Sequence, residues 1–390
     1  TTGAIHAVDA ARKKRTPPTG ILPHLPPPHV SVGPNELDIY TYGDDLYTAM
    51  LNDIRHAKEK IFFEFFIVKD DSTGQHIKAE LINAARRGVQ VYIILDTWGN
   101  ANQSPRARRF PPIKNLHYIL FPFIRPGIIT QRSRDKGRDH RKILTVDSKI
   151  SYVGGYNIGT LYAHHWRDTH VRIEGPATWE LENAFIDMWN SYAKSDSPIL
   201  VNSRETHWDS TISTILNTPS LNSYPIAATY LNALGRARKH AWMTMGYFIP
   251  DEPMMTALVG AASRGIDVRI LIPQYSNHIY ADWVGRPHYT ELLNAGVRIF
   301  LYKEAMVHAK TMTVDGKWST VGTANIDRLS LKGNFEVNLS IYSDEFANVM
   351  EKIFSVDLTN THELTLEEWN QRNSWARLGE AVLKPLAPLL

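Results

Sequence analysis

The sequence lacks cysteine, long apolar runs and a strong net charge. The absence of cysteine from 390 residues excludes disulfides, thiolate zinc sites and cysteine nucleophiles, and it fits a reducing compartment. The sequence contains no run of about 18 apolar residues, the length that a membrane-spanning helix needs. A net charge of +3 is too small to indicate a nucleic-acid-binding protein. What is present is an ordinary globular composition, 43% hydrophobic and 21% charged, which supports a large core.

The N-terminal end differs in composition from the rest. The basic cluster Ala11–Arg15 is typical of the cytoplasmic flank of a membrane helix, and it is equally typical of a solvated tail. Six prolines follow between Pro17 and Pro28 and favour a stiff polyproline-type spacer. We expect residues 1–33 to be a basic, proline-rich tether. We also expect an anchor ahead of Thr1 that holds the protein at the cytoplasmic face of the cell membrane.

One polar pattern occurs twice. Two motifs of the form H-x-K-x4-D lie 168 residues apart, in DHRKILTVD and VHAKTMTVDG, and an Asn and a carboxylate follow each of them at matching positions. The paired positions are His140 and His308, Lys142 and Lys310, Asp147 and Asp315, Asn157 and Asn325, and Asp168 and Glu336. Each carboxylate follows its own His by 28 residues. Because chance does not keep one register across so many polar positions, the pattern indicates a duplication.

The segments upstream of each motif repeat more loosely. Matching pairs are helical periodicity at 46–57 and 228–239, apolar runs at 60–68 and 241–250, and a Gly-capped helix end with a buried strand at 85–95 and 263–273. Alternation of helix and strand before a motif hairpin indicates an α/β fold. We predict two similar α/β/α sandwich halves, at 34–200 and 201–375, related by a pseudo-twofold axis, and a helical tail at 376–390.

A pseudo-twofold axis would bring both motifs into one cleft. Residues two apart on a strand share a face, so each His would project together with its Lys. A carboxylate behind each imidazole would fix the tautomer that leaves Nε2 free, and Lys and Asn would surround a phosphate diester with donors. One His would attack phosphorus and the other would protonate the leaving alcohol, with no metal or cofactor. Asp147 and Asp315 stand at hairpin turns, where we expect a structural role.

The doubled motif, with G-x-x-N after it, resembles the phospholipase D superfamily from about Leu37 onward. Stretches such as GRDHRKILTVD, VGGYNIG and VGTANIDRLS look like its bacterial cardiolipin synthase branch. The resemblance implies His140 as nucleophile and His308 as general acid/base, although the near-symmetry of the two motifs leaves open which His attacks. It further implies phosphate binding by Lys142, Lys310, Asn157 and Asn325, and orientation of the imidazoles by Asp168 and Glu336. Family enzymes often carry Ser at the positions of Gly155 and Thr323, so only Thr323 is expected to offer phosphate a hydroxyl.

Several functions are compatible with this chemistry. The first is a phosphatidyltransferase that makes cardiolipin from two phosphatidylglycerol molecules and releases glycerol at a membrane surface. The segment Phe121–Lys142 supports it, because apolar residues and a net charge of +5 suit an anionic leaflet. A phospholipase D that uses water as acceptor stays open. The mild charge disfavours a nucleic-acid phosphodiesterase, and the two complete motifs disfavour a non-catalytic scaffold. The sequence indicates no oligomeric state.

Overall fold

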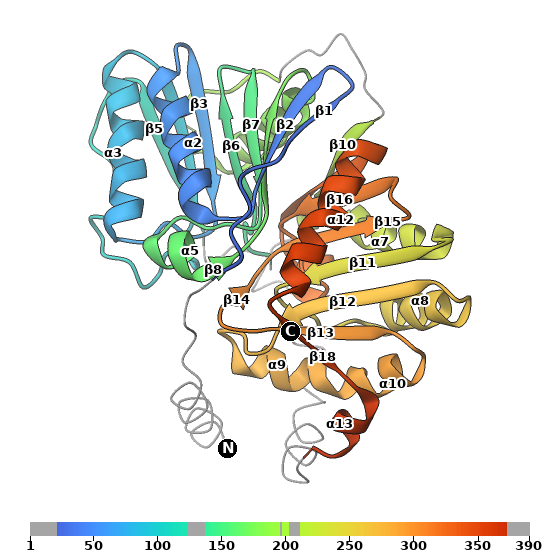
Figure 1. Ribbon diagram of the computed structural model, residues 1–390. Helices are drawn as coiled ribbons and strands as arrows, with labels where there is room; N and C mark the ends of the chain where they lie inside the picture. The colour runs from blue at the N-terminus through green and yellow to red at the C-terminus, as the bar shows by residue number, and fades with distance from the viewer. Residues whose placement is uncertain (1–21, 123–136, 196, 203–210, 373–390) are drawn as a thin grey trace.

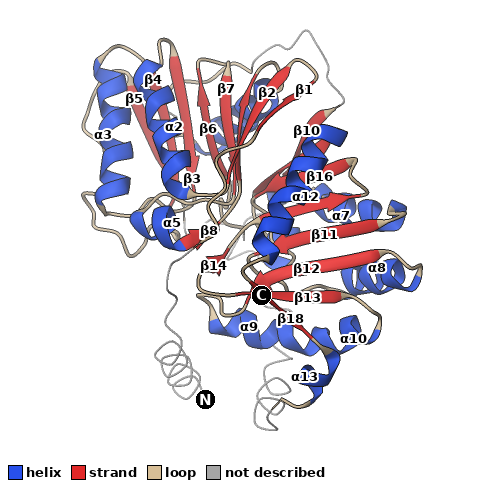
Figure 2. Ribbon diagram, viewed as in Figure 1, coloured by secondary structure: helices blue, strands red, loops and turns tan. Residues whose placement is uncertain are grey.

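The computed structural model of the protein describes residues 22–122, 137–195, 197–202 and 211–372. In these ranges the chain forms two eight-stranded mixed sheets (Figure 1, Figure 2). The first sheet consists, in spatial order, of β1 (His29–Val32), β2 (Asn35–Tyr40), β9 (His170–Glu174), β7 (Ile150–Gly154), β6 (Lys142–Val146), β3 (Lys60–Phe65), β4 (Gln90–Asp96) and β5 (Leu116–Phe121). The second consists of β10 (Ile212–Asn217), β17 (Glu336–Tyr342), β16 (Trp318–Gly322), β15 (Lys310–Val314), β11 (His240–Met245), β12 (Asp267–Pro273), β13 (Arg298–Tyr302) and β18 (Thr361–Leu364).

The two sheets share a six-stranded core with the same topology. The order β9-β7-β6-β3-β4-β5 in the first sheet matches β17-β16-β15-β11-β12-β13 in the second. In each, three strands are parallel and the motif hairpin runs antiparallel beside them. The prediction of two similar α/β halves is therefore confirmed. A parallel pair of short strands, β8 (Trp166–Arg167) and β14 (Met306–Val307), joins one half to the other.

Helices cover both faces of each sheet. The first half contains α2 (Gly43–His56), α3 (Ser72–Arg86), α5 (Thr160–His165) and α6 (Thr178–Tyr192). The second contains α7 (Pro225–Arg236), α8 (Glu252–Ser263), α9 (Ile279–Gly285), α10 (Tyr289–Asn294), α11 (Arg328–Lys332), α12 (Asp344–Leu358) and α13 (Leu366–Asn370), with 3-10 turns η2 (Pro219–Leu221) and η3 (Arg286–His288). None of these described helices is long and apolar enough to cross a membrane.

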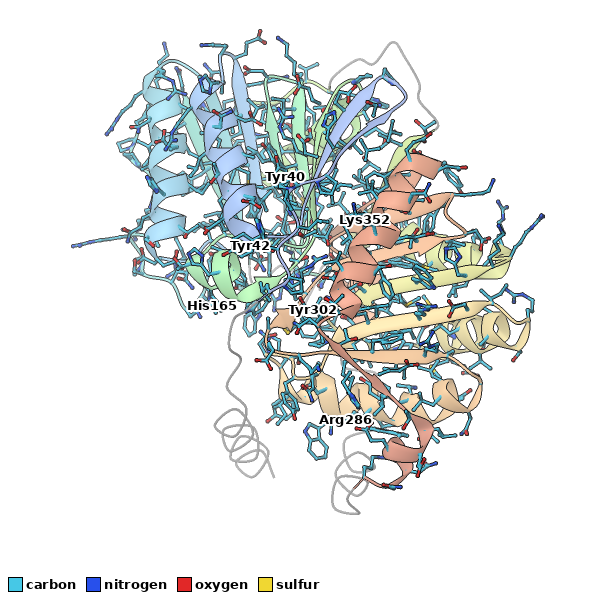
Figure 3. The ribbon with its side chains drawn as sticks, viewed as in Figure 1. Tyr40, Tyr42, His165, Arg286, Tyr302 and Lys352 are labelled. Carbon is cyan, nitrogen blue, oxygen red and sulfur yellow. The ribbon has the colours of Figure 1, made fainter. Side chains whose placement is uncertain are left out.

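One apolar core lies between the halves and fixes their relative placement. It joins Ile143 and Val171 of the first sheet to Val337 and Leu339 of the second, with side chains of α6 and α12. Figure 1 shows α12 standing between the two sheets. Side chains fill this junction in Figure 3, where Tyr302 at the end of β13 lies close to the first half.

The repeated segments form the elements that the sequence predicts, for local reasons. Asp71 and Asp251 cap α3 and α8, because their carboxylates accept the backbone N–H of Gly74 at 3.0 Å and of Met254 at 3.2 Å. Gly88 follows α3 with φ of 103°, a conformation that favours glycine, and leads the chain into β4.

Two features of the fold differ from the sequence prediction. Each half has a third parallel strand, β5 or β13, that the sequence analysis missed. The prediction that residues 1–33 form a tether is wrong at the C-terminal end of this range, because His29–Val32 form β1. The alternate residues Val30 and Val32 of this strand are buried in the core between the halves. The rest of the tether up to residue 21, the centre of the Phe121–Lys142 segment and the predicted tail at 376–390 lie outside the described residues.

Candidate active site

The two motifs begin their hairpins in the same way. His140 lies two residues before the first residue of β6 and His308 two residues before that of β15, and each motif lysine is the first residue of its strand. Lys142 Nζ donates to the carbonyl oxygen of His140 at 2.6 Å, and Lys310 Nζ donates likewise to the carbonyl of His308. Both lysines are fully buried. Each ammonium group is therefore held beside the backbone of its own His.

Backbone bridges between the halves set the position of each His. The N–H of His140 donates to the carbonyl of Phe335 at 3.0 Å, and the N–H of His308 donates to the carbonyl of Arg167 at 2.7 Å. The residue after each of these carbonyls is a motif carboxylate, Glu336 or Asp168. Each His thus lies next to the carboxylate of the opposite half.

The side chains of the two histidines also pair with carboxylates of the opposite half. His140 Nδ1 lies 3.0 and 2.9 Å from the two carboxylate oxygens of Glu336, and His308 Nδ1 lies 2.7 Å from Asp168 Oδ2. The equal spacing of 28 residues in the sequence points to pairing within each half, and that interpretation is wrong. The pairing crosses between the halves because the backbone bridges bring each His to the other half's carboxylate strand. Neither half therefore contains a complete His–carboxylate pair, and the site needs both.

The two carboxylates that pair with the motif histidines, Glu336 and Asp168, have different surroundings. The Thr323 hydroxyl donates to Glu336 Oε2 at 2.5 Å, and it accepts the N–H of Val337 at 2.9 Å. The hydroxyl expected to face phosphate is thus directed to the carboxylate instead. At the equivalent Gly155, an added Cβ would lie 2.1 Å from Asp168 Oδ1. Glycine is required there because the shorter Asp168 occupies the space that a side chain would fill.

The two motif asparagines hold the loops after the central strands. Asn157 Oδ1 accepts the N–H of Ile67 at 3.2 Å, and Asn325 Oδ1 accepts the N–H of Tyr247 at 3.3 Å. Among the described residues, neither amide nitrogen has a hydrogen-bond acceptor. This orientation leaves one NH2 donor group on each asparagine for a substrate.

The aspartates at the ends of the motifs lie at hairpin turns. Asp147 has φ of 53° and its carboxylate accepts the N–H groups of residues 58, 59 and 60 at 2.8, 2.8 and 3.0 Å. Asp315 has φ of 56° and does the same for residues 238, 239 and 240 at 2.8, 2.7 and 3.0 Å. Each aspartate ties its hairpin to the start of the adjacent central strand.

Burial and mutual repulsion shape the electrostatics of the site. Burial lowers the pKa of His140 well below its usual value, and Lys142 and Lys310 lower it further. The pKa of His308 is also lowered well below its usual value, by burial first and then by Lys310, Lys142 and His140. Because residues of both motifs affect one another's titration, the two motifs form one site.

The lysines and carboxylates respond to the same burial. Burial lowers the pKa of Lys142 to about 7 and that of Lys310 to about 8, against the attraction of the carboxylates. Burial also raises the pKa of Glu336 to about 8, although Lys142 and the Thr323 hydroxyl oppose the rise. It raises the pKa of Asp168 against the attraction of Lys310. An anion that enters the site would favour the charged form of each lysine.

A cluster of buried charges behind the first motif was missed by the sequence analysis. Arg141 Nε donates to Glu64 Oε1 at 2.7 Å, and the N–H of Asp139 donates to Asp96 Oδ2 at 3.1 Å. Burial raises the pKa of Glu64 and, more strongly, that of Asp139, while Arg141 opposes both shifts. Alternation along the strand places Arg141 on the face opposite His140 and Lys142. Only the fold brings Glu64 to Arg141 and Asp96 to Asp139.

Aromatic rings flank the two imidazoles, and these too were missed. The ring of Phe66 meets His140 edge-on with centroids 4.8 Å apart. Trp166 and Tyr247 lie 5.0 and 5.6 Å from His308. Such walls exclude water and strengthen hydrogen bonds inside the site. In the described ranges no group of three His, Asp or Glu residues is arranged to hold a metal ion.

Comparisons with known proteins identify relatives of this chain. A family profile described as "Cardiolipin synthase, PLD-like domain" matches residues 50–189 and 230–358. The chain is 34% identical over 370 residues to a cardiolipin synthase of Clostridium perfringens, covering 91% of this chain and 77% of that protein. It is 34% identical over 367 residues to a cardiolipin synthase of Staphylococcus aureus, covering 91% and 74%. The solved phosphatidylserine synthase of Haemophilus influenzae has the same fold, with a TM-score of 0.71, 14% identity and 94% and 96% coverage.

Proposed function

Since the chain belongs to the phospholipase D-like cardiolipin synthase family, we propose that it makes cardiolipin from two phosphatidylglycerol molecules and releases glycerol. The chain is a phosphatidyltransferase of the phospholipase D superfamily and acts on phospholipids. The observation that carries the proposal is the convergence of two His–carboxylate pairs and two buried lysines at one site. This set can hold one phosphodiester and serve both steps of a transfer.

In the first step, His140 acts as the nucleophile. Its Nδ1–H is directed to Glu336, so the Nε2 lone pair is available to attack phosphorus. A P–N bond forms while the bond from phosphorus to the glycerol oxygen breaks. His308 gives its Nε2 proton to that oxygen, and glycerol leaves. The negative charge of the substrate phosphate and Asp168 together favour the protonated form of His308 before transfer.

In the second step, the hydroxyl of another phosphatidylglycerol replaces glycerol. His308 takes the hydroxyl proton, the alcohol oxygen attacks phosphorus, and the P–N bond to His140 breaks. Cardiolipin leaves and both imidazoles return to their starting states. The phosphohistidine would be hydrolysed if water reached it, so exclusion of water decides between transferase and phospholipase D.

Lys142, Lys310, Asn157 and Asn325 would bind the phosphoryl oxygens. Both lysines are buried next to the imidazoles, and their ammonium groups would neutralise charge that develops on the equatorial oxygens. The amide nitrogens of the asparagines add neutral donors. We also propose that the enzyme works on anionic lipid at the cytoplasmic face of the cell membrane, which the basic composition of Ala11–Arg15 supports.

A product assay tests the proposed function. The protein is incubated with phosphatidylglycerol vesicles, and lipids and glycerol are measured by mass spectrometry. We expect cardiolipin and glycerol in equal amounts from the unsubstituted protein and a loss on the order of a thousandfold or more in His140→Ala and His308→Ala. His362→Ala, in which an exposed His paired with Glu368 is removed, is the matched control and should keep full activity. Phosphatidic acid as the main product would replace the transferase by a hydrolase.

A further inference from the structure

The two motif histidines have unlike neighbouring side chains besides the proposed phosphate-binding residues. Next to His308, the ring of Tyr247 also lies 5.6 Å from the ring of His278. The Tyr247 hydroxyl donates to Asn277 Oδ1 at 2.5 Å. Tyr247 is half-buried, whereas Asn277 and His278 are exposed. Side chains that can form hydrogen bonds therefore lie between the ring of His308 and the surface.

The equivalent place beside His140 is apolar. Ile67 corresponds to Tyr247, because the N–H of each donates to a motif asparagine. Phe66, which packs against His140, corresponds to Gly246, where an added Cβ would lie 2.9 Å from the His308 ring. Among the described residues, the apolar Phe66 and Ile67 therefore take the places beside His140 that Gly246 and the polar Tyr247 take beside His308.

The reaction requires such an asymmetry. The leaving glycerol and the incoming head group exchange protons with the same His, so both must occupy its side of the site. A polyol needs several hydrogen-bond partners there, and a buried polar group without a partner is costly. The diacylglycerol part lies on the opposite side of phosphorus and needs apolar contacts.

We propose that Tyr247, Asn277 and His278 form the subsite that receives the glycerol head group of the leaving and of the accepting lipid. The proposal rests on the proposed function and makes it more specific. The Tyr247 oxygen, whose proton lies toward Asn277, accepts from a glycerol hydroxyl, and the Asn277 amide donates to one. Selection of a polyol over water and simple alcohols then follows from these hydrogen bonds.

A competition between acceptors tests the subsite. Phosphatidylglycerol vesicles are supplied with a fixed mixture of deuterated glycerol and ethanol, and deuterated phosphatidylglycerol and phosphatidylethanol are measured by mass spectrometry. Both alcohols compete for the same phosphohistidine, so the product ratio is independent of how fast that intermediate forms. We expect Tyr247→Phe and Asn277→Ala to lower the ratio of glycerol to ethanol product about five- to tenfold. Ile67→Leu, at the equivalent position beside His140, is the matched control and should keep the ratio.

The outcomes separate this proposal from the proposed function. A ratio within about twofold of the original in both Tyr247→Phe and Asn277→Ala would overturn the subsite, even if cardiolipin is still made. Wild-type protein that prefers glycerol but makes no cardiolipin would overturn the proposed function and leave the subsite standing, provided that the two variants lose the preference. A fall in the ratio for Ile67→Leu equal to that of the variants would also overturn the subsite, because the effect would not be specific to the polar side.

Discussion

The two halves of the molecule share a strand order and a motif, yet they differ in what is buried behind the motif. In the first half, four charged side chains are buried there, from Glu64, Asp96, Asp139 and Arg141. The register of the strands places Thr244, Pro273, Val307 and Ala309 at the equivalent positions of the second half, and none of these is charged. The groups proposed to bind the phosphate are the same in both halves, whereas the groups behind them have diverged. The site is thus symmetric in the proposed phosphate-binding groups and asymmetric in the residues around them.

The surroundings of the two imidazoles extend this comparison. The ring of Phe66 packs against His140, whereas one ring that packs against His308 belongs to Tyr247, whose hydroxyl donates to the exposed Asn277. The carboxylate paired with His140 belongs to the longer Glu336, which also accepts from the Thr323 hydroxyl. The carboxylate paired with His308 belongs to the shorter Asp168, which lies against Gly155. Divergence of this kind would let the two copies of the motif take the proposed roles of nucleophile and acid.

The largest expected effect on activity comes from breaking the two His–carboxylate pairs that cross between the halves. Glu336→Gln and Asp168→Asn should each lower kcat on the order of a thousand- to ten-thousandfold, because each removes the carboxylate that fixes the tautomer of the opposite half's His. The measurement is steady-state turnover of phosphatidylglycerol. A double-mutant cycle should find His140 strongly coupled to Glu336, and His308 to Asp168. Equal coupling within the halves, between His140 and Asp168, would contradict the exchange.

The next effect concerns the buried charges of the first half. Arg141→Ala leaves Glu64 and Asp139 without their buried cation, so the free energy of unfolding should fall by about 3–5 kcal/mol in urea titration. The exposed Arg55, which pairs with the half-buried Glu80, provides the control, since Arg55→Ala should cost less than about 1 kcal/mol.

A graft of the second half's residues sharpens that prediction. Combining Glu64→Thr and Asp139→Val with Arg141→Ala removes the acids together with their partner and should restore most of the lost stability. If Arg141→Ala alone is as stable as the original, then Ala309 and Arg141 are equivalent choices and the buried cluster has no structural role.

The motif lysines predict an unequal response to pH. An ammonium group is charged below its pKa, so binding of a phosphate diester is strongest at low pH and weakens as pH rises through about 7 for Lys142 and about 8 for Lys310. We expect kcat/KM to fall by about tenfold per pH unit once the first lysine discharges, measured from about pH 6 to about pH 10. A profile that stays flat to about pH 10, where lysine ordinarily titrates, would show that the burial has no effect on binding.

The smallest effect concerns a buried histidine of the first half. Among the described residues, His170 has no hydrogen-bond partner for either ring nitrogen, and burial lowers its pKa to about 3. Its equivalent Asn338 accepts the N–H groups of Thr323 and Ala324 at 3.2 Å each. His170→Asn should therefore raise the free energy of unfolding by about 1 kcal/mol. A loss of stability would mean that the imidazole packing outweighs the unmade hydrogen bonds.

Local features of this site could be predicted from the sequence, and tertiary ones could not. The repeat identified both motif hairpins, and Asp147 and Asp315 marked their turns because aspartate tolerates positive φ. The exchange of carboxylates had no sequence signal, since His140 and Glu336 are 196 residues apart and meet only through the backbone bridge to Phe335. Tyr247 gave no signal either, because its counterpart is the apolar Ile67.

The central claim is that one site built from both halves divides its work, with His140 as nucleophile and His308 as acid and base. Its most direct test is a trapping experiment with a phosphatidyl p-nitrophenyl ester, whose leaving group needs no proton. After an alkaline quench, peptide mass spectrometry locates the phosphatidyl adduct. We predict that His308→Ala accumulates the adduct on His140 and that His140→Ala forms none. An adduct on His308 in the His140→Ala variant would contradict the account.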